Sequence, residues 1–345
     1  MPVSLPDNLT FDQDGKFISL LKIPNSTNTS GWGSLLLPVI VVRNGNGPTV
    51  LFTGGNHGDE YEGPIALRKL ANELKPEQIQ GQVIIVPYLN YPAVLAGTRL
   101  SPVDGLNMNR SFPGSPDGSM TPMIADFVYR ELVLRSDVVV DFHSGGNSMV
   151  FEPCVVIHHL EDTEQMKKTV AAAQQFGAPI SLVLRELDSK GMLDTVVENC
   201  GKIFISTELG GGGCVSPRTL KIAENGIRNI LQHFEILPPD NEVVPETRFL
   251  ETPDIGSYIM ASQEGLYETL VGLGEPVLKG QIIGRIHSLT HIDAPAVEVH
   301  SQIDGVLITR AGRASVKNWD TIAVIATDLD VSEFDVNLAM IIKDN

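Results

Sequence analysis

Residues 49–70 constrain the fold of this chain more than any other stretch. The apolar run 49–52 leads into two glycines, His57 and Glu60 follow three residues apart, and a helical pattern begins near Glu62. This order of strand, glycine turn and helix places a histidine and a carboxylate at the carboxyl end of a strand. Open α/β sheets hold their functional residues at that edge. We therefore expect a ligand site where this strand ends.

Short apolar runs and helical patterns continue to alternate through the first part of the chain. Strands are expected at 34–42, 49–52, 83–87, 137–142, 180–184 and 202–208, and helices at 62–74, 123–134, 161–176, 191–199 and 217–234. This alternation predicts an α/β fold with a mostly parallel, mixed sheet and helices on both faces. Residues 91–119 show little periodicity, and a long structureless stretch inside a compact domain is usually functional.

The sequence pattern changes at Pro238–Asn241, after which short β segments are separated by glycine turns. A length of 345 residues fits two domains. We expect a catalytic domain over 1–240, with a β-rich lead-in at its start, and a small all-β domain over 241–345. Residues 272–281 and 304–307 resemble half of a biotinyl/lipoyl-like sandwich. No carrier lysine occupies the hairpin of that sandwich, so only the fold is similar.

Charge and composition exclude several classes of function. The net charge of −17 argues against nonspecific binding to nucleic acid or to an anionic membrane, since both require a basic surface. The three cysteines form no CxxC pair, which is typical of a reducing compartment. Neither a signal-peptide pattern nor an apolar run of membrane-spanning length is present. We expect a cytoplasmic protein, and an exposed strand edge on the β-rich domain would allow homo-oligomers to form.

Three residues have the chemistry of a zinc site. His143 directly follows the apolar run 137–142, so it ends a strand, as His57 and Glu60 do. A catalytic zinc takes three protein ligands and keeps its fourth position for water. Taken singly, the histidines are consistent with a turn or a core residue and Glu60 with a first-turn acid, but together the three predict a metal site. Asp141 shares a strand face with His143 and either orients that histidine or is a solvated or capping residue.

Two further groups are suited to amide hydrolysis. Glu208 ends the strand 202–208, where a carboxylate beside a cleft can act as general base. The alternative is a strand-end charge in water. Arg99 and Arg110 lie in the aperiodic segment, and arginines can bind a carboxylate or stabilise an oxyanion. The alternative for each arginine is a solvated surface residue. The glycines at 210–213 would let the backbone approach a substrate, or they form a flexible loop.

The motifs together resemble the succinylglutamate desuccinylase/aspartoacylase family, which is related to the zinc carboxypeptidases. The resemblance covers most of residues 30–235 and rests on 55–60, 90–93, Arg99, 107–112, 141–145 and Glu208. It implies a zinc-carboxypeptidase-like fold, one zinc ion per chain and hydrolysis of the amide bond of a small N-acyl amino acid.

The resemblance also implies a role for each matching residue. The zinc ligands would be His57, Glu60 and His143, and the general base Glu208. Arg99 would polarise the scissile carbonyl, while Asn109 and Arg110 would hold a substrate carboxylate. The family motif often has aspartate where this chain has Asn107, which puts an acid role there in doubt.

Within the family, residues 54–64 and 107–114 look most like those of the bacterial Nα-acetyl-2,4-diaminobutyrate deacetylases of ectoine breakdown. The other functions considered are aspartoacylase, succinylglutamate desuccinylase and metallocarboxypeptidase activity. A non-catalytic zinc- or ligand-binding protein, docking through its β-rich domain, is the alternative outside the enzymes.

Overall fold

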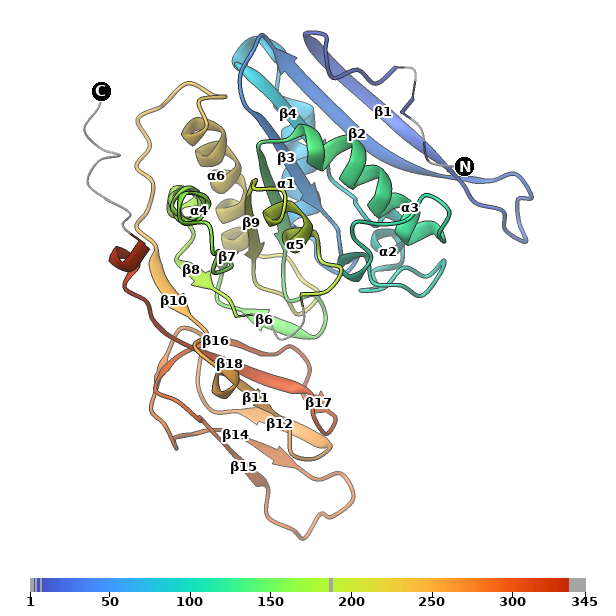
Figure 1. The fold of residues 1–345 in the computed structure, drawn as a ribbon. Helices are drawn as coiled ribbons and strands as arrows, with labels where there is room; N and C mark the ends of the chain where they lie inside the picture. The colour runs from blue at the N-terminus through green and yellow to red at the C-terminus, as the bar shows by residue number, and fades with distance from the viewer. Residues whose placement is uncertain (1–2, 4, 7, 186–188, 335–345) are drawn as a thin grey trace.

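The computed structural model describes residues 3, 5–6, 8–185 and 189–334, and a large mixed sheet runs through them (Figure 1). Its strands in the first part of the chain are β1 (Gly15–Pro24), β2 (Ser34–Asn44), β3 (Thr49–Gly54), β4 (Gly81–Val86), β5 (Val138–His143), β6 (Met149–Phe151), β7 (Cys154–Ile157), β8 (Ile180–Val183), β9 (Ile203–Glu208) and β10 (Arg248–Glu251). Strands β4, β3, β5 and β9 are parallel neighbours in that order. The predicted mostly parallel, mixed sheet is confirmed.

Helices cover both faces of this sheet (Figure 1). They are α1 (Glu62–Glu73), α2 (Tyr91–Ala96), α3 (Met120–Phe127), α4 (Thr163–Phe176), α5 (Leu193–Glu198) and α6 (Pro217–His233). Helices α1, α4 and α6 pack on one apolar core with Phe52 and Val140 of the sheet. Helices α3 and α5 pack on the opposite core with Val139 and Phe204. The expectation of helices on both faces is therefore confirmed.

Strand alternation positions the polar residues of β5 and β9. Val140 and Phe142 face the core of α1, α4 and α6, whereas Val139 faces the other side. Because side chains alternate along a strand, Asp141 and His143 continue the row of Val139. The parallel register pairs Asp141 with Ser206 and His143 with Glu208. The two expected site residues therefore end neighbouring strands at the same level.

Local structure differs from expectation in three places. The segment 91–119 contains α2 and a 3-10 turn at Met108–Arg110, although its sequence shows little periodicity. Gly97, at a φ of 61°, ends α2 after six residues. Helix α3 continues through a π-helical turn instead of spanning 123–134 regularly. Strands β6 and β7, of three and four residues, are not among the predicted strands.

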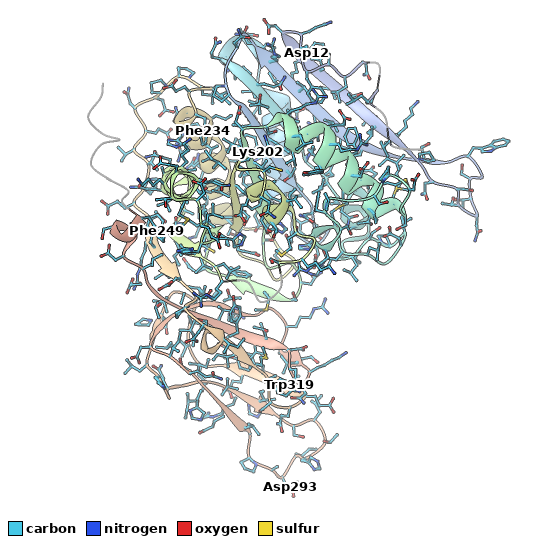
Figure 2. The ribbon with its side chains drawn as sticks, in the orientation of Figure 1. Asp12, Lys202, Phe234, Phe249, Asp293 and Trp319 are labelled. Atoms are coloured by element: carbon cyan, nitrogen blue, oxygen red, sulfur yellow. The ribbon has the colours of Figure 1, made fainter. Side chains whose placement is uncertain are left out.

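The rest of the chain forms a β-rich part. Its strands are β11 (Tyr258–Met260), β12 (Gly265–Thr269), β13 (Pro276–Val277), β14 (Ile282–His287), β15 (Val297–His300), β16 (Gly305–Ala311), β17 (Ser315–Val316) and β18 (Thr321–Asp328). A second sheet, in the order β15-β14-β12-β17, packs through Ile286 against Leu307 and Ile325 of the large sheet. Figure 2 shows Phe249 where the two parts of the chain meet and Asp293 at the far end of the β-rich part.

The two parts of the chain share strands. Strand β10 pairs with β8 on one side and with β18 on the other, and β16 pairs with β6. The large sheet therefore continues from the α/β part into the β-rich part. The domain division at 240 stays a prediction, and the end of the predicted second domain, 335–345, lies outside the described residues. None of the helices in the described ranges has the length and hydrophobicity that crossing a bilayer requires.

Candidate active site

A cavity of about 220 Å³ opens where β5 and β9 end, and it brings the predicted site residues together. Its walls include His57, Arg99, Asn109, Arg110, His143 and Glu208 from the α/β part. Tyr258, Ile308 and Thr309 of the β-rich part line the same cavity. The site is thus enclosed by both parts of the chain.

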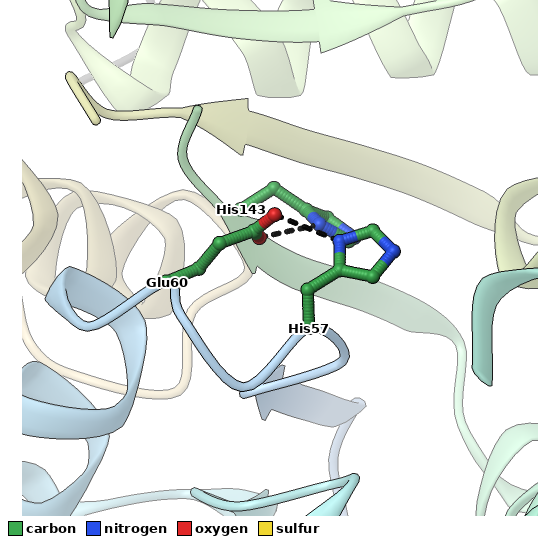
Figure 3. A group of neighbouring side chains, drawn as sticks. All are labelled: His57, Glu60 and His143. Carbon is green, nitrogen blue, oxygen red and sulfur yellow. Dashed lines mark hydrogen bonds and ion pairs between the residues drawn. The ribbon is translucent and has the colours of Figure 1, made fainter. Parts of the chain in front are cut away.

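The three predicted metal ligands form one buried group (Figure 3). Nδ1 of His57 lies 2.7 Å from Oε1 of Glu60, and Nδ1 of His143 lies 2.9 Å from Oε2 of the same carboxylate. One ligand atom from each residue falls within 4.8 Å of the others. Two imidazole nitrogens and a carboxylate oxygen are a donor set that suits catalytic zinc. These residues therefore fit a metal ion.

The outer nitrogen of each histidine also has a partner. Nε2 of His143 donates to Oδ2 of Asp141 at 2.8 Å, and Nε2 of His57 lies 3.2 Å from Oδ1 of Asn107. A hydrogen bond at one ring nitrogen fixes the tautomer and leaves the lone pair of the other for a metal. Both Nδ1 atoms, which face Glu60, are therefore the nitrogens available as ligands.

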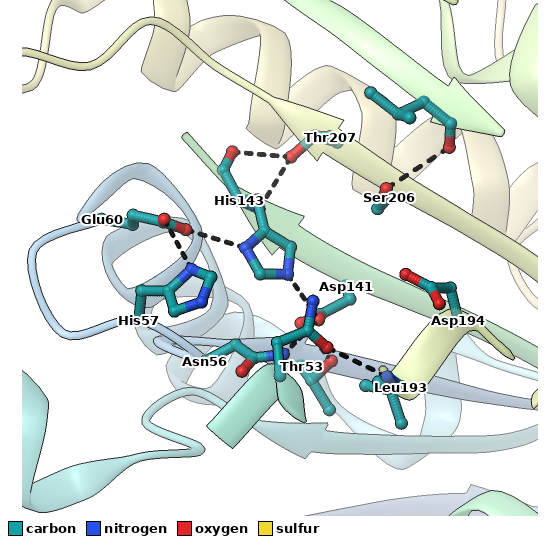
Figure 4. A network of polar contacts seen from close by, with 12 residues as sticks. Thr53, Asn56, His57, Glu60, Asp141, His143, Leu193, Asp194, Ser206 and Thr207 are labelled. Atoms are coloured by element: carbon teal, nitrogen blue, oxygen red, sulfur yellow. Dashed lines mark hydrogen bonds and ion pairs between the residues drawn. The ribbon is translucent and has the colours of Figure 1, made fainter. Parts of the chain in front are cut away.

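Asp141 is held in turn by two side chains at the centre of the site (Figure 4). Thr53 donates to Oδ1 at 2.6 Å, and Asn56 donates to Oδ2 at 2.9 Å. Asp141 is completely buried. Asp141 is therefore not a solvated or capping residue, and its hydrogen bond orients His143.

The turn before α1 positions His57 and Glu60. Gly55 has a φ of 69°, and a Cβ on Gly58 would lie 2.0 Å from the backbone of Ala93. Glycine is therefore required for the turn to pack against α2. Helix α1 begins after Glu60 with Tyr61 as its N-cap. Neither His57 nor Glu60 is thus a capping or first-turn residue of α1.

Burial and charge set the ionisation of His57, Glu60 and His143. Burial alone would lower the pKa of His143, but the carboxylates of Asp141 and Glu60 raise that pKa well above its usual range. Burial alone would raise the pKa of Glu60, yet His57 and His143 lower it. The two buried carboxylates therefore favour positive charge between them. A divalent cation at the Nδ1 atoms would supply that charge in place of a proton.

Glu208 lies beside this group with an unused oxygen. Its Oε2 atom is buried and accepts no hydrogen bond from the described residues. Burial, with a further contribution from the negative charge of Glu60, raises the pKa of Glu208 to about 8. A carboxylate in this state can take up and return a proton in a reaction near neutral pH. The sequence-based expectation of a carboxylate next to the metal ligands agrees with this position.

The polar residues of 99–110 face the same cavity. Nη1 of Arg99 lies 3.2 Å from Nδ1 of His57 and 3.6 Å from Oε1 of Glu60. Oδ1 of Asn109 accepts a hydrogen bond from the backbone N–H of Leu193 at 2.9 Å, which leaves its amide NH₂ as a donor. Nη1 of Arg110 donates to the carbonyl oxygen of Asn109 at 2.8 Å. This wall of the cavity therefore offers donors suited to an anionic group.

One sequence expectation about the site is wrong. Glycines 210–213 do not line the cavity. A Cβ on Gly211 would lie 2.2 Å from the carbonyl oxygen of Met149, and the carbonyl of Gly210 accepts hydrogen bonds from Gly145 and Phe151. These glycines allow backbone segments of the protein, and not a substrate, to approach closely.

Replacing Asp141 by asparagine should weaken metal binding by about 10- to 100-fold, because the carboxylate that orients His143 is lost. Zinc affinity, measured by competition with a chromophoric chelator, checks this expectation. Asp137→Asn is the matched control. This aspartate is exposed just before the start of β5, and its carboxylate accepts a hydrogen bond from the N–H of Thr49. Equal zinc affinities of the Asp141 variant and the unmodified protein would contradict the orienting role.

The sequence is similar to those of proteins of known family. Residues 46–234 match the family described as Succinylglutamate desuccinylase/Aspartoacylase catalytic domain. The chain is 48% identical to the N-alpha-acetyl-L-2,4-diaminobutyric acid deacetylase of Halomonas elongata over 94% of this chain and 95% of that protein.

Solved structures agree with these sequence matches. The product-bound ectoine utilization protein EutE (DoeB) from Ruegeria pomeroyi has a TM-score of 0.92 and 44% identity, covering 95% of this chain and 99% of that one. A succinylglutamate desuccinylase from a Silicibacter species has a TM-score of 0.89 and 44% identity, covering 94% of this chain and 100% of that one. The resemblance expected from the motifs is confirmed.

Proposed function

The chain belongs to the succinylglutamate desuccinylase/aspartoacylase family of amidohydrolases, and from that premise we propose that it removes the acetyl group of Nα-acetyl-L-2,4-diaminobutyrate with one zinc ion per chain. The observation that carries the proposal is the single cavity in which His57, His143, Glu208 and two arginines meet. The names of the Halomonas and Ruegeria relatives support this choice of substrate.

The proposed zinc ligands are His57, Glu60 and His143. When bound, zinc would act as a Lewis acid that polarises a carbonyl group and lowers the pKa of water. The protein contributes the buried ligand set and the hydrogen bonds that Asp141 and Asn107 make to its two histidines.

The hydrogen-bond donors of Arg99, Asn109 and Arg110 bind the substrate. The guanidinium of Arg110 and the amide NH₂ of Asn109 bind the α-carboxylate of the acyl amino acid, since an arginine and a carboxylate form charge-assisted hydrogen bonds. Arg99, beside His57 and Glu60, donates to the oxygen of the scissile carbonyl. Its positive charge stabilises the negative charge that develops on that oxygen during attack.

Glu208 carries the proton through the reaction. Its carboxylate takes a proton from the attacking water as the new C–O bond forms. It then gives the proton to the amine nitrogen as the C–N bond breaks, so that acetate and a free amine are released. The Oε2 atom of Glu208, which has no hydrogen-bond partner among the described residues, is the oxygen that does this.

The size of the cavity favours a small substrate over a polypeptide. A cavity of about 220 Å³ fits an acylated amino acid, and Tyr258, Ile308 and Thr309 of the β-rich part line it. These residues would obstruct the path of a longer chain. The metallocarboxypeptidase alternative is therefore disfavoured, while succinylglutamate desuccinylase, the name of the Silicibacter relative, is the second candidate.

A substrate panel tests the proposal. The zinc-loaded protein is assayed with Nα-acetyl-L-2,4-diaminobutyrate, N-acetylaspartate, N-succinylglutamate and an unblocked tripeptide. We expect kcat/KM for the first compound to exceed the others by about 100-fold or more, because a site with a buried polar partner rejects ligands that leave it unpaired. Preference for succinylglutamate, acetylaspartate or the tripeptide would contradict the proposal.

A further inference from the structure

Asp194 is a buried carboxylate in the wall of the cavity that none of the proposed steps uses. It is the second residue of α5 and only 5% exposed. It lines the same cavity as His143, Asn109 and Glu208. Aspartate is rarely buried to this degree without a partner, because removing a charge from water is costly.

The hydrogen bonds of Asp194 leave half of its carboxylate unused. Oδ1 accepts from the backbone N–H and, at 2.9 Å, from the hydroxyl of Thr195. Among the described residues no group donates to Oδ2. Figure 4 shows the carboxylate at the start of α5, facing the space beside Ser206 and His143. A free acceptor with negative charge therefore borders the substrate space.

Among the described residues Asp194 is not part of an ion pair. The charge of His158 lowers the pKa of Asp194, but Nδ1 of His158 is already 3.0 Å from Glu198. Burial raises the pKa of Asp194, which is the mark of a carboxylate without sufficient counter-charge. A cationic ligand in the cavity would provide that charge.

Asp194 also lies next to the carboxylate-binding wall. The N–H of Leu193, the residue before it, donates to Oδ1 of Asn109. One ligand bound here would meet donors for an anion at Asn109 and an acceptor for a cation at Asp194. The hydroxyl of Thr309 lines the same cavity and has no hydrogen-bond partner among the described residues, so it is a further acceptor in the cavity wall.

We infer that Asp194 binds the side-chain ammonium of the substrate, and that it makes the site selective for acylated diamino acids with a short side chain. This inference rests on the proposed function, which places the α-carboxylate at Asn109 and Arg110. A carboxylate facing an ammonium forms a charge-assisted hydrogen bond, and such bonds are the strong ones in a desolvated site. Neutral and acidic side chains would leave the Asp194 charge buried and unpaired.

The test measures kcat/KM of the Asp194→Asn variant and of the unmodified protein with two substrates. With Nα-acetyl-2,4-diaminobutyrate, kcat/KM should fall by about 100-fold, chiefly through KM, because the buried charge pair is lost. With Nα-acetyl-2-aminobutyrate, which has the same carbon skeleton without the amine, kcat/KM should stay near the unmodified value or rise. Asp137→Asn is the matched control: it makes the same change at an exposed aspartate that does not line the cavity, so the preference should be retained.

The outcomes separate this inference from the proposed function. If the unmodified protein does not deacetylate the diaminobutyrate compound, the proposed function fails. If it does so and the Asp194 variant keeps its preference, or loses both substrates equally, the role of Asp194 alone is overturned. Calorimetric binding of the products 2,4-diaminobutyrate and 2-aminobutyrate to zinc-loaded protein provides a readout independent of turnover. Equal affinity of the unmodified protein for both products would also overturn the inference, even if the variant does not fold.

Discussion

Glu208→Gln should lower kcat by about 10²- to 10⁴-fold while the bound zinc and the substrate KM change little. Glutamine has the shape of glutamate but cannot take a proton from water. The side chain ends β9 beside His143, and its Oε2 atom is not hydrogen-bonded in the described structure. The substitution therefore breaks no protein contact at that atom, and the loss should be confined to the chemical step. Steady-state kinetics and metal analysis of the same preparation measure both quantities.

The control for this substitution is Glu152→Gln. Glu152 follows β6, pairs with Arg218 and does not line the cavity. Its replacement should leave kcat unchanged. A Glu208 variant with normal turnover would remove this residue from the mechanism. A variant whose activity fell only in proportion to lost zinc would show that Glu208 acts on the metal and not on the proton.

Removal of the metal should abolish hydrolysis altogether. His57, Glu60 and His143 are the groups that would hold the metal, and their Nδ1 and carboxylate oxygen atoms lie 2.7 and 2.9 Å apart. The Lewis acid is then missing, and the remaining donors cannot replace it. Dialysis against a chelator followed by assay checks the loss. Zinc should restore activity to the unmodified protein but not to Glu60→Gln. This substitution replaces the one carboxylate among the three proposed ligands with a neutral amide.

The meeting of His143 and Glu208 could be predicted from the sequence for a topological reason. Each follows an apolar run that reads as a buried strand, and parallel strands end at the same edge of a sheet. The observed register places the two residues side by side. Asp141 was accessible to the same reasoning, because a charged residue two positions before His143 shares its face of the strand.

The partner of His57 was beyond sequence reasoning. Asn107 lies 50 positions away, in a segment without periodicity, and its contact with Nε2 depends on the path of that segment around α2. Its side chain also accepts from the N–H of Asn109, so it supports the 3-10 turn as well as the histidine. The asparagine at this position thus positions its neighbours and needs no acid chemistry.

Asp194 and Thr309 were missed for related reasons. An aspartate near the start of a helix is ordinary, since the helix dipole favours it there. Only the three-dimensional structure shows that this one is buried in the cavity wall. Thr309 reaches the site because β16 is joined through β18 to β10, a pairing that no local pattern indicates.

The glycines at 210–213 illustrate an ambiguity of composition. A glycine run permits close approach by a substrate or by another backbone segment, and the sequence does not distinguish them. In the structure the close neighbours of Gly211 are Gly145 and Met149. The segment after β9 therefore packs against the loop after β5.

Titration of the metal-free protein with zinc tests the central claim most directly. The rate of Nα-acetyl-L-2,4-diaminobutyrate hydrolysis is followed as zinc is added to a known concentration of chains. The proposed site predicts no activity at the start, a linear rise and a plateau at one equivalent, with Glu60→Gln inactive throughout. Full hydrolysis by the metal-free protein, or equal activity of the Glu60 variant with zinc, would contradict the site built from His57, Glu60 and His143.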